Sequence, residues 1–222
     1  MKRITFAVLF FVLAGAAVAA EEVTEVPPPG PDNILAHLVQ MIQEGNYAEA
    51  VEKGNVYLAR AEEKYGPESP EVAAILNLVV DAMWRGGRTD EEVFALARRS
   101  LAIGEKALGP DDPEVGDSLN TLGNLSWMIS DFAAAAKYYG RSLAIKEAGL
   151  GPDHPDVATM LNNLALTHYM LGEFVAAREN FERALAIREK EFGPEHPVLA
   201  CTLMNLGVLV RDQGLLEEGR VY

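Results

Sequence analysis

The sequence has very little cysteine, which bears on how the fold is held together. Cys201 is the only cysteine among 222 residues, so no internal disulfide framework exists and packing must supply the stability. Its neighbours Leu199, Ala200 and Leu203 are apolar or small, and this setting favours a packing role over a reactive one.

Positive charge is also scarce. Lysine and arginine total 19 against 33 acidic residues, and the net charge is −14. Nonspecific binding to nucleic acid or to an anionic membrane surface needs a basic protein surface, so the net charge argues against both. We expect a protein or peptide partner that is neutral or basic overall.

Motifs of catalysis are missing. The sequence has no Gly-rich phosphate loop, no HExxH and no nucleophile elbow, so we expect no enzymatic activity and no cofactor. His154 and His196, beside Asp153 and Glu195, are the best metal candidates. Because they belong to turns that recur along the chain for structural reasons, we expect no metal site there.

The first 20 residues differ from the rest. Lys2 and Arg3 precede a largely apolar run from Ile4 to Leu13, and small residues follow at 17–20, which is the pattern of a secretory signal peptide. An uncleaved anchor is the alternative, although residues 4–20 are short for a bilayer span. Ala16 stands where a lipoprotein would need cysteine. Cleavage after Ala19 or Ala20 predicts a periplasmic or secreted protein with no membrane insertion.

Proline marks the organisation of the remaining chain. All 12 prolines lie either in residues 21–32 or in four turns of the form GP-x-x-P. Residues 21–32, EEVTEVPPPGPD, predict an acidic, stiff spacer that leans toward polyproline II. The four turns begin at Gly66, Gly109, Gly151 and Gly193, at spacings of 43, 42 and 42 residues. Such a period indicates stacked structural repeats over residues 33–222, the last of them incomplete.

The turn has a physical explanation. Its glycine can adopt the left-handed conformation that ends a helix, and its second proline suits the first position of the next helix. Ser69 and Asp112 are predicted N-caps; His154 and His196 occupy the same place as weaker caps. Apolar residues at helical spacing exclude propeller blades and predict helices at 34–44, 47–65, 70–85, 89–108, 113–129, 132–150, 155–171 and 174–192, with another beginning at 197.

Small and large residues alternate at matching places in successive repeats. In one repeat they are Leu161, Leu164, Ala165, Gly172, Phe174, Ala177, Phe181 and Ala184. In the repeat before it they are Leu119, Leu122, Gly123, Ser130, Phe132, Ala135, Tyr139 and Ser142. With the motif LNNLALTHYMLGEFVAARENFERALAIREKEFGPEHP, residues 33–222 resemble the 42-residue tetratricopeptide repeat of kinesin light chains and many bacterial proteins.

The resemblance implies an all-α, right-handed superhelical solenoid of antiparallel helix pairs. Departures lie at the ends: Ala36-His37-Leu38 replaces the usual core of the first repeat, which is expected to be a cap, and the last repeat stops early. The repeat after Gly66 carries one extra residue near Gly86-Gly87.

The first helix of each pair is expected to line the concave side, where the repeat makes rows of equivalent residues. Three rows carry amides, and the fourth carries both tryptophans. The rows are Asn77, Asn120, Asn162 and Met204; Leu78, Thr121, Asn163 and Asn205; Asp81, Asn124, Leu166 and Val208; and Trp84, Trp127, Tyr169 and Arg211.

Amide side chains offer a donor and an acceptor, so such rows can bind the backbone of an extended peptide, and the resemblance implies this role. Packing between neighbouring helices is the alternative. Exposed aromatics would bind apolar side chains of the ligand, or else pack between first helices.

The sequence therefore predicts a non-catalytic scaffold that binds a peptide or protein in its concave groove. Two alternatives remain open. The chain could be the recognition arm of a larger exported protein, for example one with a caspase-like protease domain, or it could self-associate through the apolar face of its last helix.

Overall fold

The computed structural model describes residues 33–212, and these residues form nine α-helices and one short 3-10 helix. They are α1 Ile34–Gln43, α2 Tyr47–Tyr65, α3 Pro70–Arg85, α4 Glu91–Ala107, α5 Pro113–Met128, α6 Phe132–Leu150, α7 Pro155–Leu171, α8 Phe174–Phe192, η2 Pro197–Leu199 and α9 Ala200–Asp212.

The predicted helix bounds are confirmed to the residue for α2, α3, α6, α7 and α8. Among the helices predicted with both bounds, the largest difference is at α4, which begins at Glu91 rather than Thr89. Asp90 is its N-cap and its carboxylate accepts hydrogen bonds from the backbone N–H groups of Glu92 and Val93, so Thr89 stays outside the helix. The helix predicted to begin at 197 opens with η2, and α9 itself begins at Ala200.

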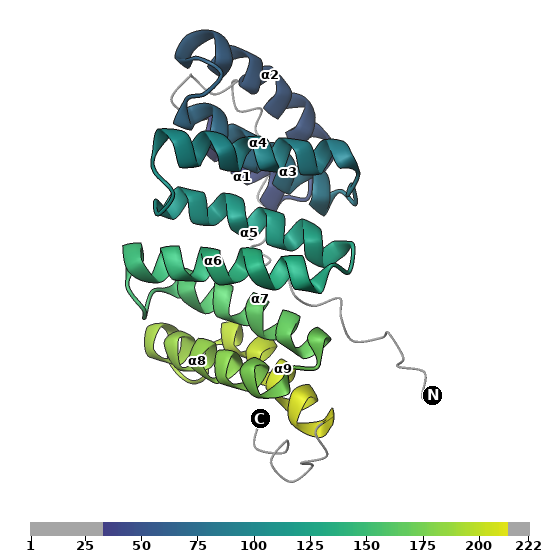
Figure 1. The fold of residues 1–222 in the computed structure, drawn as a ribbon, viewed down its shortest axis with the longest axis vertical. Helices are drawn as coiled ribbons and strands as arrows, with labels where there is room; N and C mark the ends of the chain where they lie inside the picture. The colour runs from purple at the N-terminus through teal and green to yellow at the C-terminus, as the bar shows by residue number, and fades with distance from the viewer. Residues whose placement is uncertain (1–32, 213–222) are drawn as a thin grey trace, which may run out of the picture.

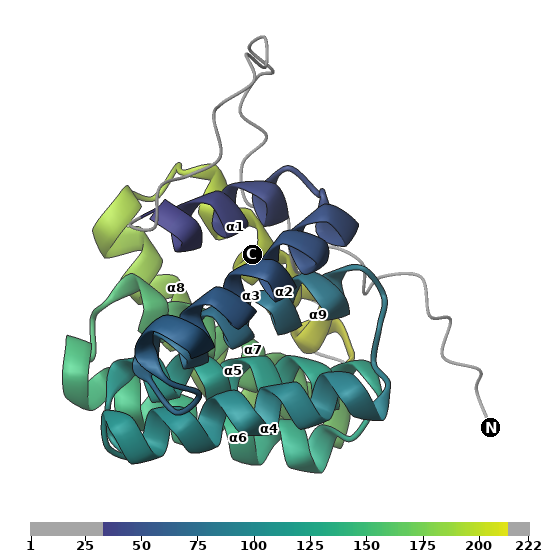
Figure 2. The ribbon, with the colours of Figure 1, turned by 90° about the horizontal axis from the view of Figure 1, so that it is seen from above.

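Each helix packs against the next one along the chain, and this makes an all-α solenoid. Figure 1 shows the pairs stacked from α1 and α2 at one end to α7, α8 and α9 at the other. Seen from above in Figure 2, the stack is curved: α4 and α6 form the outer side, and α5 and α7 lie inside them. First helices therefore line the inner side of the curve, as expected.

The repeated turns confirm the caps and correct one detail of the glycine conformation. Ser69, Asp112, His154 and His196 each accept a backbone hydrogen bond at the start of the following helix. Gly151 has the expected positive φ of 92°, but its ψ of 155° belongs to the mirror-extended region rather than to the left-handed helical one. The next residue, Pro152, disfavours helical ψ in the residue before it, so ψ becomes extended.

Close approach of helices depends on small residues, as the repeat pattern predicted. A Cβ added to Gly123 of α5 would lie 2.5 Å from Cε1 of Tyr139 of α6. The equivalent pair one repeat later is Ala165 with Phe181, both fully buried in one cluster. The aromatic ring thus lies directly over the small residue of its own helix pair.

A recurring arginine joins consecutive second helices. Arg99, Arg141 and Arg183 each form an ion pair with a glutamate of the preceding second helix. Each also donates to the backbone carbonyl of the proline that follows the turn glycine: Pro67, Pro110 and Pro152. We call this contact the arginine clasp. Val56 occupies the place of the clasp arginine in α2, so the first described repeat lacks this contact.

The predicted signal peptide (1–20), the spacer (21–32) and the end of the last repeat lie outside the described residues. Within 33–212, no helix has both the length and the apolar content needed to cross a membrane.

Candidate functional site

The candidate site is the inner face, which we define as the side of α3, α5, α7 and α9 that carries the four predicted rows. One residue of the first row is fully engaged within the protein. Asn77 donates to Oγ of Ser118 at 2.8 Å and accepts from Oγ of Ser100 at 3.0 Å. Both ends of its amide are used by α4 and α5, so Asn77 orders the packing of these helices and offers little to a ligand.

Two other asparagines meet across neighbouring first helices. Nδ2 of Asn163 in α7 donates to Oδ1 of Asn120 in α5 at 3.3 Å. Their spacing is 43 residues, one more than the repeat, so the structure pairs Asn120 with Asn163 rather than with Asn162 of its own row. This pairing leaves Nδ2 of Asn120 and Oδ1 of Asn163 without a protein partner in the described structure, and both residues are half-buried.

Asn124 extends this cluster along α5. Its Oδ1 accepts a hydrogen bond from the hydroxyl of Tyr139 at 2.7 Å, which fixes the amide and leaves Nδ2 without a partner among residues 33–212. We call Asn120, Asn124 and Asn163 the amide cluster. It presents two donors from α5 and one acceptor from α7, which is the complement of a peptide backbone.

The remaining predicted amides differ in access. Asn162 is only 7% exposed, and its Oδ1 is buried without a partner. Asn205 of α9 is half-buried. Their roles in binding stay predictions, with Asn205 the more accessible of the two.

The aromatic row is more deeply placed than the amide cluster. Trp84 is 6% exposed and belongs to the large core cluster, and Arg85 lies over its ring at 5.0 Å. Trp127 is half-buried and makes an edge-to-face contact with Phe132. Trp84 therefore packs within the core, which was the alternative to ligand binding, while Trp127 retains some exposed surface for a ligand.

The far end of the row forms a polar chain that the sequence did not predict. The hydroxyl of Tyr169 donates to Oδ2 of Asp212 at 2.5 Å, and Arg211 pairs with Oδ1 of the same carboxylate at 3.0 Å. Burial, followed by the bond to Asp212, raises the pKa of Tyr169 to about 12. Again the spacing is 43 residues, so Tyr169 meets Asp212 and not Arg211.

Acidic side chains beside the amide cluster are neutralised within the protein. Arg85 pairs with Asp81 at 2.8 Å, and Lys146 pairs with Asp117 at 2.6 Å. Burial raises the pKa of Asp81, and Arg85 opposes that effect. With these charges paired, the part of the inner face around the amide cluster offers neutral hydrogen-bonding groups.

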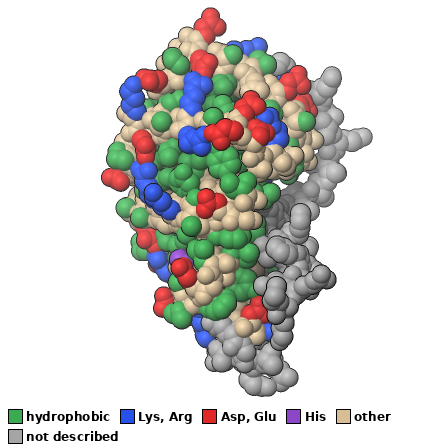
Figure 3. Space-filling view, turned by 45° about the vertical axis from the view of Figure 1, so that its right-hand side comes forward, with side chains coloured by type: hydrophobic (Ala, Val, Ile, Leu, Met, Phe, Trp, Pro, Cys, Tyr) green, Lys and Arg blue, Asp and Glu red, His purple; other side chains and the backbone are tan. Residues whose placement is uncertain are grey.

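Apolar side chains also reach the surface. Figure 3 shows hydrophobic side chains gathered over one side of the molecule between charged ones. Leu35 and Val39 of α1 and Met204 of α9 are among the exposed large apolar residues. Met204 belongs to the first row, and Leu35 and Val39 stand one repeat before Asn77 and Asp81. Such positions could bury apolar side chains of a peptide at either end of the amide cluster.

No group of three or more His, Cys, Asp or Glu side chains in residues 33–212 is arranged to hold a metal ion. His154 and His196 instead cap helices through Nδ1, at 3.1 Å and 3.2 Å from the backbone nitrogens of Asp156 and Val198.

A model of the tetratricopeptide repeat matches residues 91–148, 131–190 and 156–218. The chain belongs to the tetratricopeptide repeat family. The repeats of this family serve as scaffolds for protein interactions and are generally non-catalytic. No curated protein sequence matches this one.

Solved structures share the fold at low sequence identity. BtubC (BKLC) from P. vanneervenii is 24% identical with a TM-score of 0.74, covering 86% of this chain and 75% of that one. A putative kinesin light chain repeat protein from Podosopora anserina is 22% identical with a TM-score of 0.71, covering 86% and 92%. RapI in its apo form is 17% identical with a TM-score of 0.67, and the match covers 85% of this chain and half of that one.

Proposed function

We propose that this tetratricopeptide protein binds an extended peptide segment of a partner along its inner face, without catalysing a reaction. The observation that carries the proposal is the amide cluster. Two of its members bond to each other and the third is fixed by Tyr139, yet each keeps one hydrogen-bonding atom without a partner in the part of the chain that the structure describes.

The arrangement of these atoms suits a peptide backbone. Nδ2 of Asn120 and Asn124 can donate to peptide carbonyls, and Oδ1 of Asn163 can accept from a peptide N–H. Because the protein already holds the three amides in place, little side-chain freedom is lost on binding. The partner is expected to be neutral or basic overall, given the net charge of −14.

The proposal is tested with peptides selected on the purified protein from a display library of random dodecamers. Replacing Asn124 and Asn163 together with alanine is expected to weaken binding of a selected peptide at least about fivefold, since each lost hydrogen bond contributes about 0.5–1.5 kcal/mol. Asn55→Ala is the matched control, because Asn55 is exposed on α2, a second helix away from the inner face. Equal affinities for the double variant and the control would reject the inner face as the site.

We also propose that the chain is exported and cleaved after Ala19 or Ala20. Mass spectrometry of the protein recovered from the envelope fraction is expected to find Ala20 or Glu21 at its N-terminus. Recovery with residues 1–20 attached would instead support an anchor.

A further inference from the structure

A cation recurs at one position of the second helices, Lys146 in α6 and Arg188 in α8, 42 residues apart. In the first of these repeats the protein itself neutralises it. The Lys146 side chain is 5% exposed, and its Nζ lies 2.6 Å from Oδ1 of Asp117 and 3.7 Å from Oδ2 of Asp156. A buried cation with two carboxylates beside it is the expected arrangement, because an unpaired buried charge is strongly destabilising.

One repeat later the cation is kept and both carboxylates are gone. Thr159 stands where the repeat would place the equivalent of Asp117, and Val198 replaces Asp156. The guanidinium of Arg188 donates to Oγ1 of Thr202 at 2.6 Å, and no carboxylate in residues 33–212 pairs with it. Burial lowers the pKa of Arg188, and Cys201 nearby opposes this only in part. Within residues 33–212, Arg188 is thus a half-buried cation with no carboxylate partner.

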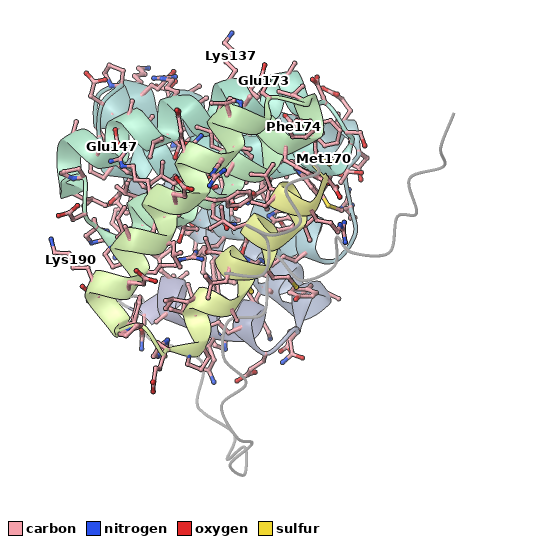
Figure 4. All side chains as sticks on the ribbon, turned by 90° about the horizontal axis from the view of Figure 1, so that it is seen from below. Lys137, Glu147, Met170, Glu173, Phe174 and Lys190 are labelled. Carbon is pink, nitrogen blue, oxygen red and sulfur yellow. The ribbon has the colours of Figure 1, made fainter. Side chains whose placement is uncertain are left out.

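This cation lies next to the inner face. Asp117, which Lys146 contacts, is three residues before Asn120 and so on the same side of α5. Thr159 is four residues before Asn163 on α7 by the same geometry, and its side chain is exposed. Figure 4 shows α8 and α9 at the end of the stack, with Lys190, two residues beyond Arg188, at the opposite end of α8 from Phe174.

We propose that Arg188 binds a carboxylate of the peptide that occupies the inner face, from an aspartate or glutamate side chain. This inference rests on the proposed function and adds one requirement to it: a single acidic residue near one end of the bound segment. A carboxylate is the chemistry that the equivalent Lys146 already takes from its own chain, and a guanidinium can bind a carboxylate through two parallel hydrogen bonds. A partner that is neutral or basic overall can still carry this one acid.

Thr159→Asp gives the sharpest test, because it restores a carboxylate at the place that Asp117 occupies beside Lys146. Changing the acidic residue of a selected peptide from Glu to Gln is expected to weaken binding to the unmodified protein on the order of tenfold. The same change is expected to have no effect on binding to the T159D variant. T159D is also expected to raise the midpoint of thermal unfolding without peptide, since the new carboxylate pairs with Arg188.

A small probe separates this inference from the proposed function. N-acetylglutamate amide is titrated into 15N-labelled protein while the Nε–H resonance of Arg188 is followed, with N-acetylglutamine amide as the matched neutral probe. A saturable shift with the first probe alone, lost in T159D, supports the inference even if no library peptide binds. Equal response to both probes, or an unchanged response in T159D, would overturn it, whatever the library shows.

Discussion

At the scale of single residues, the turn between α5 and α6 stores strain. Ser130 has a φ of 64°, and it is the only residue other than glycine with positive φ in residues 33–212. Gly45, Gly87 and Gly172 occupy the matching turns of the other helix pairs, with φ from 79° to 90°. A side chain in this region costs about 1–2 kcal/mol, which glycine avoids.

Ser130→Gly is therefore expected to stabilise the fold by about 0.5–1 kcal/mol, since the relieved strain exceeds the added chain entropy of glycine. Urea unfolding followed by circular dichroism measures the change. Gly172→Ser is the reciprocal variant and is expected to destabilise by a similar amount. A loss of stability in both variants would show that Ser130 makes a contact that offsets its strain.

A second residue-scale feature is an exchange of polar for apolar partners between repeats. Tyr139 donates to Asn124 in one repeat, and the equivalent residues in the next are Phe181 and Leu166. The repeat that has the tyrosine hydroxyl also has the asparagine that accepts from it, and the next repeat has neither. This is why Asn124 is held rigidly beside the amide cluster, and why its row does not continue through Leu166.

Tyr139 predicts a dependence of stability on alkaline pH. Burial raises its pKa above the ordinary value of 10.0, so the folded state holds the proton more tightly than the unfolded state does. Stability from this group is complete below pH 10 and falls as pH rises above it. Unfolding midpoints between pH 8 and 11.5 are expected to fall less in Tyr139→Phe than in the unmodified protein. Identical slopes would contradict the assignment.

The sequence predicted which residues lie on the first helices but not which of them contact each other. The repeat correctly placed the asparagines on first helices, but it could not show that stacked helices pair residues 43 apart. That offset joins Asn120 to Asn163 and Tyr169 to Asp212. The loss of acids around Arg188 was visible in the sequence, because Asp117 and Asp156 have counterparts at Thr159 and Val198, yet only the contacts of Lys146 show why those positions matter.

At the scale of helices, packing within a pair depends on Gly123. An alanine methyl group there would meet the ring of Tyr139 at 2.5 Å, so Gly123→Ala is expected to destabilise by about 1–3 kcal/mol. Gly140→Ala is the matched control on α6, because an added Cβ meets no atom within 4 Å. The control is expected to stabilise by up to about 1 kcal/mol through helix propensity. Thermal melts of Gly123→Ala and Gly140→Ala measure these changes in stability. Unfolding midpoints that shift in the same direction by similar amounts would contradict the packing role of Gly123.

Packing between pairs is supported by the arginine clasp. Arg99 contacts Glu62 at 2.6 Å and the Pro67 carbonyl at 3.3 Å, both in the preceding repeat. Its neighbour Arg98 pairs with Glu91 of its own helix. Arg99→Ala is expected to cost about 0.5–1 kcal/mol and Arg98→Ala close to nothing, because these side chains are partly exposed and only the first joins two repeats. Urea titrations at low and high salt measure the free energy of unfolding of both variants, and the difference between them is expected to shrink at high salt. A larger loss of stability in Arg98→Ala than in Arg99→Ala would contradict the clasp.

The helix bounds were well predicted because glycine marks where most helices end and proline marks where several of the next ones begin. The predicted left-handed conformation of the turn glycine was wrong in ψ, because Pro152 favours an extended ψ at Gly151. The clasp was missed although its arginines and glutamates recur with the repeat, because a charge on a helix surface is usually solvated.

At the scale of the whole molecule, the described residues form a curved stack, and we propose that its inner face binds a peptide backbone. Asn77 and Trp84, toward the start of the stack, are engaged in packing. The available groups lie from α5 onward, in the amide cluster and then at Arg188. Binding is therefore expected to centre on the second half of the stack.

The most direct measurement is an amide-to-ester scan of a selected peptide, in which each backbone N–H is replaced in turn by oxygen. The proposal has Oδ1 of Asn163 accept from one peptide N–H, so one ester is expected to weaken binding to the unmodified protein on the order of tenfold and to have no effect on binding to Asn163→Ala. If no ester weakens binding, or if every ester costs the same in both proteins, the inner-face amides do not bind the peptide backbone and the central claim is wrong.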